Sequence, residues 1–256
     1  MHLFPVITIG GLNIDLSSFI AITVSAIITF VLARLAVRNL SVDKPGRLQN
    51  FMEWVAEFVH NTIASAMPLN KVKPFMSLGM TLIMFIFISN LLGLPFGIVT
   101  ETHHVNETFG ITQEVLDEHE GHAEIAWWKS PTADISVTAG LALIVFFLIN
   151  FLGLKMNTKG YLKSYFEPYW FFFPLKLIEE IAKPLTLALR LYANIFAGEV
   201  LIATILMLGV IGTPFMILWQ GFSLFVGAIQ AFLFTILTMV YISHAIVSHH
   251  DEEHEH

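Results

Sequence analysis

The sequence has no cysteine and little charge, and these two absences exclude several classes of protein. Without cysteine the chain has no disulfide bonds, no thiolate metal ligands and no cysteine nucleophile. Charged residues make up only 13% of its 256 residues, whereas an ordinary soluble domain carries about 25%. So few charges do not cover a water-facing surface. A soluble globular enzyme, a disordered protein and a basic nucleic-acid binder are therefore excluded as leading interpretations.

Three sequence patterns are also missing. The chain has no glycine-rich phosphate loop, so we do not expect it to bind ATP. It shows no internal repeat and no matched pair of broken helices, which argues against a secondary transporter. Its first sixteen residues lack the basic start and the small-residue cleavage site of a secretory signal.

Long apolar runs dominate what is present. Hydrophobic residues make up 55% of the chain, and the mean hydropathy is +0.72. A helix that spans a bilayer needs about 20 apolar residues. Five runs meet that length, over residues 17–36, 75–99, 135–154, 185–211 and 215–247. The sequence therefore predicts an all-α, polytopic protein, organised as one integral membrane domain over residues 1–256.

The last two runs are too long to stand upright in a bilayer. Residues 185–211 and 215–247 would measure about 40 and 50 Å as helices, whereas the hydrocarbon core is about 30 Å thick. Thr213 and Pro214 separate the two runs. We expect a long, strongly tilted hairpin that turns at these two residues.

The distribution of lysine and arginine predicts the orientation. Basic residues cluster after the first run, before the second and after the third, whereas the connection 100–130 holds only Lys129. Cytoplasmic loops carry an excess of basic residues. We therefore place loop 100–130 and the N-terminus outside, and the polar tail 248–256 in the cytoplasm.

Residues 48–67 have a different pattern. Phe51, Trp54, Phe58 and Ile63 recur at helical spacing, with charged residues between them. This pattern predicts an amphipathic helix on the inner membrane surface, with packing against the bundle as an equal alternative. Before the third run, Ser130 or Thr132 is the expected N-cap.

Arg190 interrupts the fourth apolar run. A charge at the bilayer centre costs roughly 2.5–3.5 kcal/mol, so Arg190 is a functional candidate, with a structural ion pair as the alternative. At 3.6 residues per turn Asn194 shares its helix stripe, whereas Glu199 points to the opposite side, about 13 Å along the axis. In the last run Ser223 and Gln230 fall close to one face, and interhelical hydrogen bonding is expected for Gln230.

Residues 183–199 read KPLTLALRLYANIFAGE, which resembles the signature helix of subunit a of F-type ATP synthase. The segments NLLGLPF at 90–96, PTAD at 131–134 and IQAF at 229–232 match the same family in the same order. The resemblance spans nearly the whole chain and is to the bacterial, Bacillus-like form.

The resemblance implies a non-catalytic stator subunit that conducts protons beside a rotating ring of c subunits in a bacterial plasma membrane. Arg190 would face the rotor carboxylate, favour its ionised form and block direct leakage between two offset half-channels. A charge pair at about 4 Å and an effective dielectric of 20 is worth about 4 kcal/mol. The implied partners are the c-ring, the b subunits of the peripheral stalk, the rest of the F1Fo ATP synthase and membrane lipid. No cofactor is implied, and sodium in place of protons would be determined mainly in the rotor.

The same resemblance assigns roles to the other site residues. Glu199 matches the carboxylate of the outer half-channel, and Asn194 would assist at the rotor face. Asp134, Ser223 and Gln230 match positions near the outer pathway or the arginine. Some relatives carry histidine at position 223, and serine cannot replace it as a group that titrates near neutral pH.

Glu179 and Glu180 are the candidates for the inner aqueous exit. Pairing with Lys176 or Lys183 is the structural alternative for both carboxylates.

Two other functional classes stay open at this point. A self-contained channel or transporter would explain the intramembrane polar residues without a partner. An intramembrane enzyme is the third class, although no nucleophile–base pair and no HExxH zinc motif is found. The histidines of loop 100–130 and of the tail are expected to be solvated rather than bound to a metal.

Overall fold

The computed structural model describes residues 5–9, 12–93, 99–102, 123–126, 128, 130–164, 171 and 173–246. Within these residues five helices are long and apolar enough to cross a membrane. This result confirms the predicted all-α, multi-pass architecture. The five are α1 (Leu16–Ala36), α4 (Met76–Gly93), α6 (Ile135–Met156), α8 (Phe173–Leu206) and α9 (Thr213–Ile246).

Shorter elements connect the long helices. They are the helices α2 (Arg47–Ala66), α3 (Leu69–Val72) and α7 (Thr158–Ser164), the 3-10 turns η1 (Lys73–Phe75), η3 (Pro131–Ala133) and η5 (Gly209–Gly212), and the strands β1 (Val6–Ile9), β2 (Leu12–Asp15), β3 (Val99–Thr102) and β4 (Ala123–Ala126). β1 pairs with β2, and β3 pairs with β4, each pair antiparallel.

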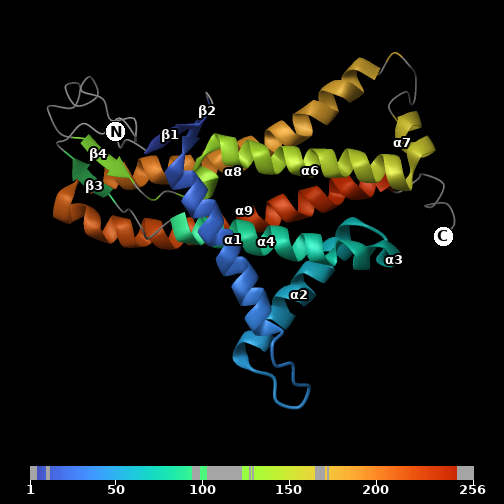
Figure 1. Cartoon of the computed structure of the whole chain (residues 1–256), viewed down its shortest axis with the longest axis horizontal. Helices are drawn as coiled ribbons and strands as arrows, with labels where there is room; N and C mark the ends of the chain where they lie inside the picture. Colours follow the sequence, from blue (N-terminus) through green and yellow to red (C-terminus); the bar gives the residue numbers. More distant parts are fainter. Residues whose placement is uncertain are drawn as a thin grey trace.

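Four of the long helices lie side by side, and the fifth crosses them. Figure 1 shows α4, α6, α9 and most of α8 in one direction, with α1 running across them at a steep angle. The 21 residues of α1 measure about 32 Å, which matches the thickness of a hydrocarbon core. The 34 residues of α8 and of α9 measure about 51 Å each. If α1 spans upright, the other four helices cross the membrane at a strong tilt.

The core lies where α4 packs against α9. Ile86, Phe234, Met239 and Ile242 are almost fully buried there, and Leu191 of α8 belongs to the same core. The outward faces keep large apolar side chains exposed, which is the pattern of helices that face hydrocarbon rather than water. At its N-terminal end α8 diverges from α6 (Figure 1), and few of its apolar residues are buried.

The hairpin of α8 and α9 differs from the expectation in its boundaries. α8 begins at Phe173 rather than at 185, with Pro184 inside it, because ion pairs at helical spacing stabilise its polar first turns. The turn is formed by η5, where Gly209 has a positive φ of 59° that favours glycine. Thr213 and Pro214 open α9 instead of making the turn, as proline suits the first turn of a helix.

The start of α6 also differs from the expectation. Asp134, and not Ser130 or Thr132, is the N-cap, and its carboxylate accepts a hydrogen bond from the Ser136 amide at 2.8 Å. Pro131 begins the 3-10 turn η3, which separates Ser130 from the helix.

The amphipathic helix α2 is divided between two environments. Val55, Val59 and Ile63 are buried against the bundle, whereas Trp54 stacks on Phe58 and both rings are exposed. Packing against the bundle is therefore present along one apolar edge of α2, while the other apolar edge faces outward. The location on the inner membrane surface stays a prediction.

Candidate functional site

A cavity of about 240 Å³ lies between α8, α9 and the end of α4. Three of the predicted site residues line it, namely Asn194, Glu199 and Ser223. Its wall also contains Asn90, Gly93, Ser130, Ile195, Ala197, Gly198, Ile202, Trp219, Phe222 and Val226. A cavity of this size with several polar groups has room for water.

Ser223 has the most distinctive environment on this wall. Its hydroxyl oxygen is buried and makes no hydrogen bond to any residue that the structure describes. Buried hydroxyl groups normally have a partner. At the wall of a polar cavity, the partner that suits such a group is a water molecule.

A buried polar network supports the same cavity from the side of α4. The Asn90 amide donates to the backbone oxygen of Gly227 on α9 at 3.0 Å, and its own oxygen accepts from the Thr132 hydroxyl at 2.7 Å. Thr132 in turn contacts the Ser130 hydroxyl at 2.8 Å. The network joins α4, η3 and α9, and so fixes one wall of the cavity.

Asn194 and Gln230 join α8 to α9. The Asn194 amide donates to the Gln230 side-chain oxygen at 3.0 Å, and Gln230 is only 2% exposed. Gln230 does not line the cavity, but its partner does. The expected interhelical hydrogen bond of Gln230 is therefore present, and it connects the deep part of the hairpin to the cavity.

Arg190 lies away from the cavity on an exposed stripe of α8. Ala193, Asn194 and Ala197 continue the stripe, whereas Leu191 on another face is fully buried. Among the residues that the structure describes, the Arg190 side chain forms neither an ion pair nor a hydrogen bond, so the structural ion pair considered above is not observed. An unpaired guanidinium on an exposed apolar helix is available to a partner outside this chain.

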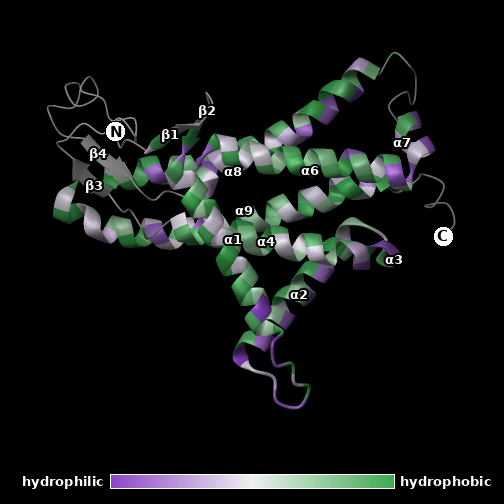
Figure 2. Cartoon of the chain, in the orientation of Figure 1, coloured by the Kyte–Doolittle hydropathy of each residue, from purple (hydrophilic) through white to green (hydrophobic). Residues whose placement is uncertain are grey.

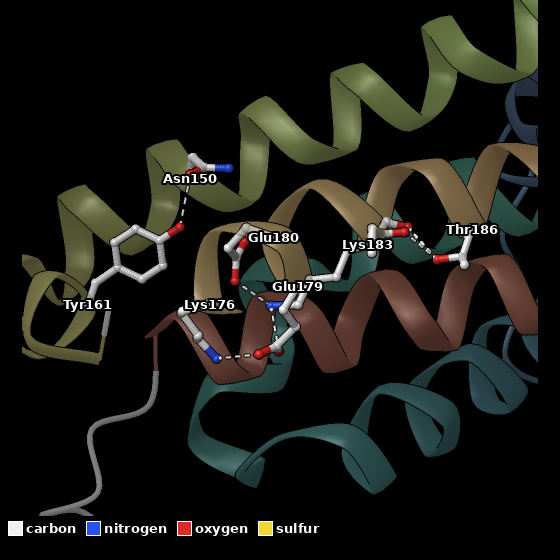
Figure 3. Close-up of polar contacts among 8 residues, drawn as sticks. Asn150, Tyr161, Lys176, Glu179, Glu180, Lys183 and Thr186 are labelled. Carbon is white, nitrogen blue, oxygen red and sulfur yellow. Dashed lines mark hydrogen bonds and ion pairs between the residues drawn. The ribbon is translucent and has the colours of Figure 1, made fainter. Parts of the chain in front are cut away.

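The first turns of α8 hold a cluster of alternating charges (Figure 3). Lys176 pairs with Glu179 at 3.0 Å, and Lys183 contacts both Glu179, at 3.4 Å, and the buried Glu180. The Lys183 ammonium also lies 5.6 Å from the ring centre of Tyr241 on α9. The pairing that the sequence offered as the structural alternative for both glutamates is present.

Asp134 is placed differently from the other predicted residues. Besides capping α6, its carboxylate accepts a hydrogen bond from the Ser18 hydroxyl of α1 at 2.7 Å. Asp134 is not among the residues that line the cavity. Its observed contacts hold the start of α6 against α1.

The sequence interpretation gave no role to Asn90 or Trp219. The Trp219 indole donates to the backbone oxygen of Gly198 at 3.3 Å, and both residues line the cavity. A signal was available for Asn90, because a polar side chain inside an apolar run is costly unless it is paired across helices.

The described residues contain no group of three or more metal-binding side chains. The histidines of loop 100–130 and those of the tail from 249 onward lie outside the described residues.

Comparisons with known proteins agree with the resemblance found in the sequence. A family model described as "ATP synthase A chain" matches residues 18–243. The chain is 46% identical to ATP synthase subunit a of Priestia megaterium over 257 residues, which cover 97% of this chain and 99% of that protein. It is 45% identical to ATP synthase subunit a of Bacillus subtilis and 47% identical to that of Anoxybacillus flavithermus, again over 97% of this chain and 99% of each relative.

Proposed function

The chain belongs to the ATP synthase A chain family, and from this membership and the site geometry we propose how it conducts protons. As a subunit a it is a multi-pass membrane component of the complex, with a proton-translocating role in the stator beside the c-ring. In our proposal it catalyses no chemical step itself. It carries protons to and from the rotor through two half-channels that meet the rotor on either side of Arg190.

The observation that carries the proposal is the exposed, unpaired Arg190 between two polar sites on one helix. Along α8, Arg190 lies about 15 Å from Glu180 and about 13 Å from Glu199. A rotor carboxylate that approached within about 4 Å would be stabilised in its ionised form by about 4 kcal/mol, at an effective dielectric of 20. This energy shifts the protonation equilibrium of the rotor carboxylate toward its ionised form about a thousandfold.

The outer half-channel uses the cavity. Glu199 is its titratable group, while Ser223 and Asn194 orient water within hydrogen-bond reach of the wall. Gln230 holds Asn194 in place through the 3.0 Å hydrogen bond. Asp134 stabilises the outer end of α6 and lies near this path rather than in it. The polar lining and the unpartnered Ser223 hydroxyl support this assignment.

The inner half-channel uses the charged first turns of α8. Glu180 and Glu179 release protons toward water there, with Lys183 as the neighbouring fixed charge. Their ion pairs do not conflict with this role, because Glu179 keeps about half of its side chain exposed. The positive charge of Arg190 separates the two half-channels and repels a proton that would pass directly between them.

We also propose an orientation in the membrane and the remaining partners. The excess of lysine and arginine at the ends of α1, α3 and α6 supports a cytoplasmic location for those ends, with the N-terminus outside. The exposed stripe around Arg190 contacts the c-ring. The b subunits of the peripheral stalk and lipid cover other outward faces.

The test is the Arg190→Ala variant in assembled complexes in inverted membrane vesicles. We expect ATP-driven acidification to be lost while passive proton leak increases, with assembly checked by detergent extraction. The matched control is Lys155→Ala, which removes an exposed cation from the last turn of α6 and should leave pumping intact. Undiminished pumping by Arg190→Ala would show that the arginine has no part in proton transfer.

A further inference from the structure

The corner between α1 and α2 carries a cluster of four basic residues. Arg34 and Arg38 lie at the end of α1, and Lys44 and Arg47 lie in the connection to α2. All four are exposed, and none of their side chains forms an ion pair or hydrogen bond within the described residues. Figure 2 shows this corner as a hydrophilic segment that projects from the bundle. The only acid in this stretch is Asp43.

The connection is held in a fixed shape. The Gln49 side chain, which is only 8% exposed, accepts a hydrogen bond from the Ser41 amide at 3.2 Å and donates to the Ser41 carbonyl at 3.0 Å. The same amide donates to Glu53 at 2.7 Å, and the Ser41 hydroxyl accepts from the Lys44 backbone amide at 3.2 Å. The four basic groups are therefore presented on an ordered loop, which lowers the entropy cost of binding a ligand.

Apolar side chains accompany the basic ones at the depth of a membrane interface. The length of α1 matches one hydrocarbon core, so its last turn ends at the headgroup layer. Phe30 and Leu40 are 70% and 67% exposed, and Trp54 of α2 is 62% exposed. Tryptophan favours this interfacial layer, where its ring meets both chains and headgroups. Arginine forms two parallel hydrogen bonds with a phosphate group.

We propose that the α1–α2 corner is a binding site for anionic phospholipid headgroups. The phosphate lies among Arg38, Lys44 and Arg47, and the acyl chains lie along the exposed apolar face of α1. Basic clusters beside a membrane span attract anionic lipids, with about a fivefold gain in relative affinity for each cation. The leaflet follows from the proposed orientation, but the site itself does not depend on it.

The test uses the assembled, purified complex in vesicles of phosphatidylcholine containing 30% phosphatidylglycerol. A trace of photoactivatable phosphatidylglycerol or phosphatidylcholine is added, and cross-links are mapped by peptide mass spectrometry. We expect residues 37–54 to be labelled at least tenfold more by phosphatidylglycerol. The triple variant Arg38→Gln, Lys44→Gln and Arg47→Gln should bring that ratio down to near one.

Two controls separate lipid binding from a change in folding. Lysine in place of Arg38 and Arg47 keeps the charge, and should keep most of the preference. Glutamine in place of Lys155 and Lys159 removes cations at another helix end and should leave labelling of 37–54 unchanged. Equal labelling of the wild type by both lipids, or a preference that survives the triple variant, would overturn the proposal. Absence of labelling by either lipid would also overturn it, because another subunit would then cover the corner.

Discussion

Replacing Asn194 by leucine should cost more stability than replacing Gln230, although both changes remove the same hydrogen bond. Gln230 is 2% exposed, whereas Asn194 lies on the open stripe of α8 and also lines the cavity. After Asn194→Leu the Gln230 oxygen stays buried without its donor, and an unsatisfied buried polar group costs about 1–3 kcal/mol. After Gln230→Leu the Asn194 amide can still reach water. Only the bond itself is lost, which averages about 0.6 kcal/mol inside a membrane protein.

The measurement is the half-life of the assembled complex in detergent at a fixed elevated temperature, because large membrane complexes unfold irreversibly. We expect Asn194→Leu to shorten the half-life at least about fivefold, for a cost of about 1 kcal/mol or more, and Gln230→Leu less than fivefold. The double variant should be no worse than Asn194→Leu alone, since the orphaned group is gone. The control is Thr204→Leu, because within the described part of the chain the Thr204 hydroxyl bonds only to Val200 of its own helix, at 2.9 Å. Equal costs for the two single variants would refute the reasoning.

Three other expectations concern proton flow and packing. Glu199→Gln should slow ATP-driven acidification by a factor of about 100 or more, the usual share of a proton relay, while the complex still assembles; normal flux would remove Glu199 from the path. Arg190→Lys should not restore coupled pumping, because a lysine that the rotor shields from water loses its proton more readily than an arginine; full activity would show that a permanent charge is unnecessary. Gly93→Ala should lower the thermal stability of the complex by about 1–3 kcal/mol, because its Cβ would lie 2.2 Å from the Ser130 Cβ. Gly140→Ala should be close to neutral, because beyond its own helix backbone no described atom would lie within 4 Å of the new Cβ.

The long helices and the separation of Arg190 from Glu199 could be predicted from the sequence. Both depend on periodicity and apolar length, which act within one segment. Helical phase alone sets Arg190 and Glu199 on opposite faces, and both residues lie within the single helix α8.

The start of α8 and the cavity wall could not be predicted in the same way. By hydropathy alone, the first turns of α8 are too polar to belong to a membrane span. A hydropathy value takes no account of the ion pair between Lys183 and Glu180. At the cavity wall the side chain of Asn90 is held by hydrogen bonds with Gly227 and Thr132, which lie 137 and 42 residues away in the chain. Such contacts depend on the tertiary arrangement, and no local pattern encodes them.

The crossing of α1 over the other helices has a mechanical consequence. In the proposed arrangement, a turning c-ring would push sideways on the stripe around Arg190, and this force would tend to rock the subunit in the plane of the membrane. Four nearly parallel helices resist such rocking poorly along the direction in which they can slide past one another. α1 crosses that direction and is fastened at its start by the hydrogen bond from Ser18 to Asp134. Together with α2, α1 supports the other helices from the side, which is what a stator under torque requires.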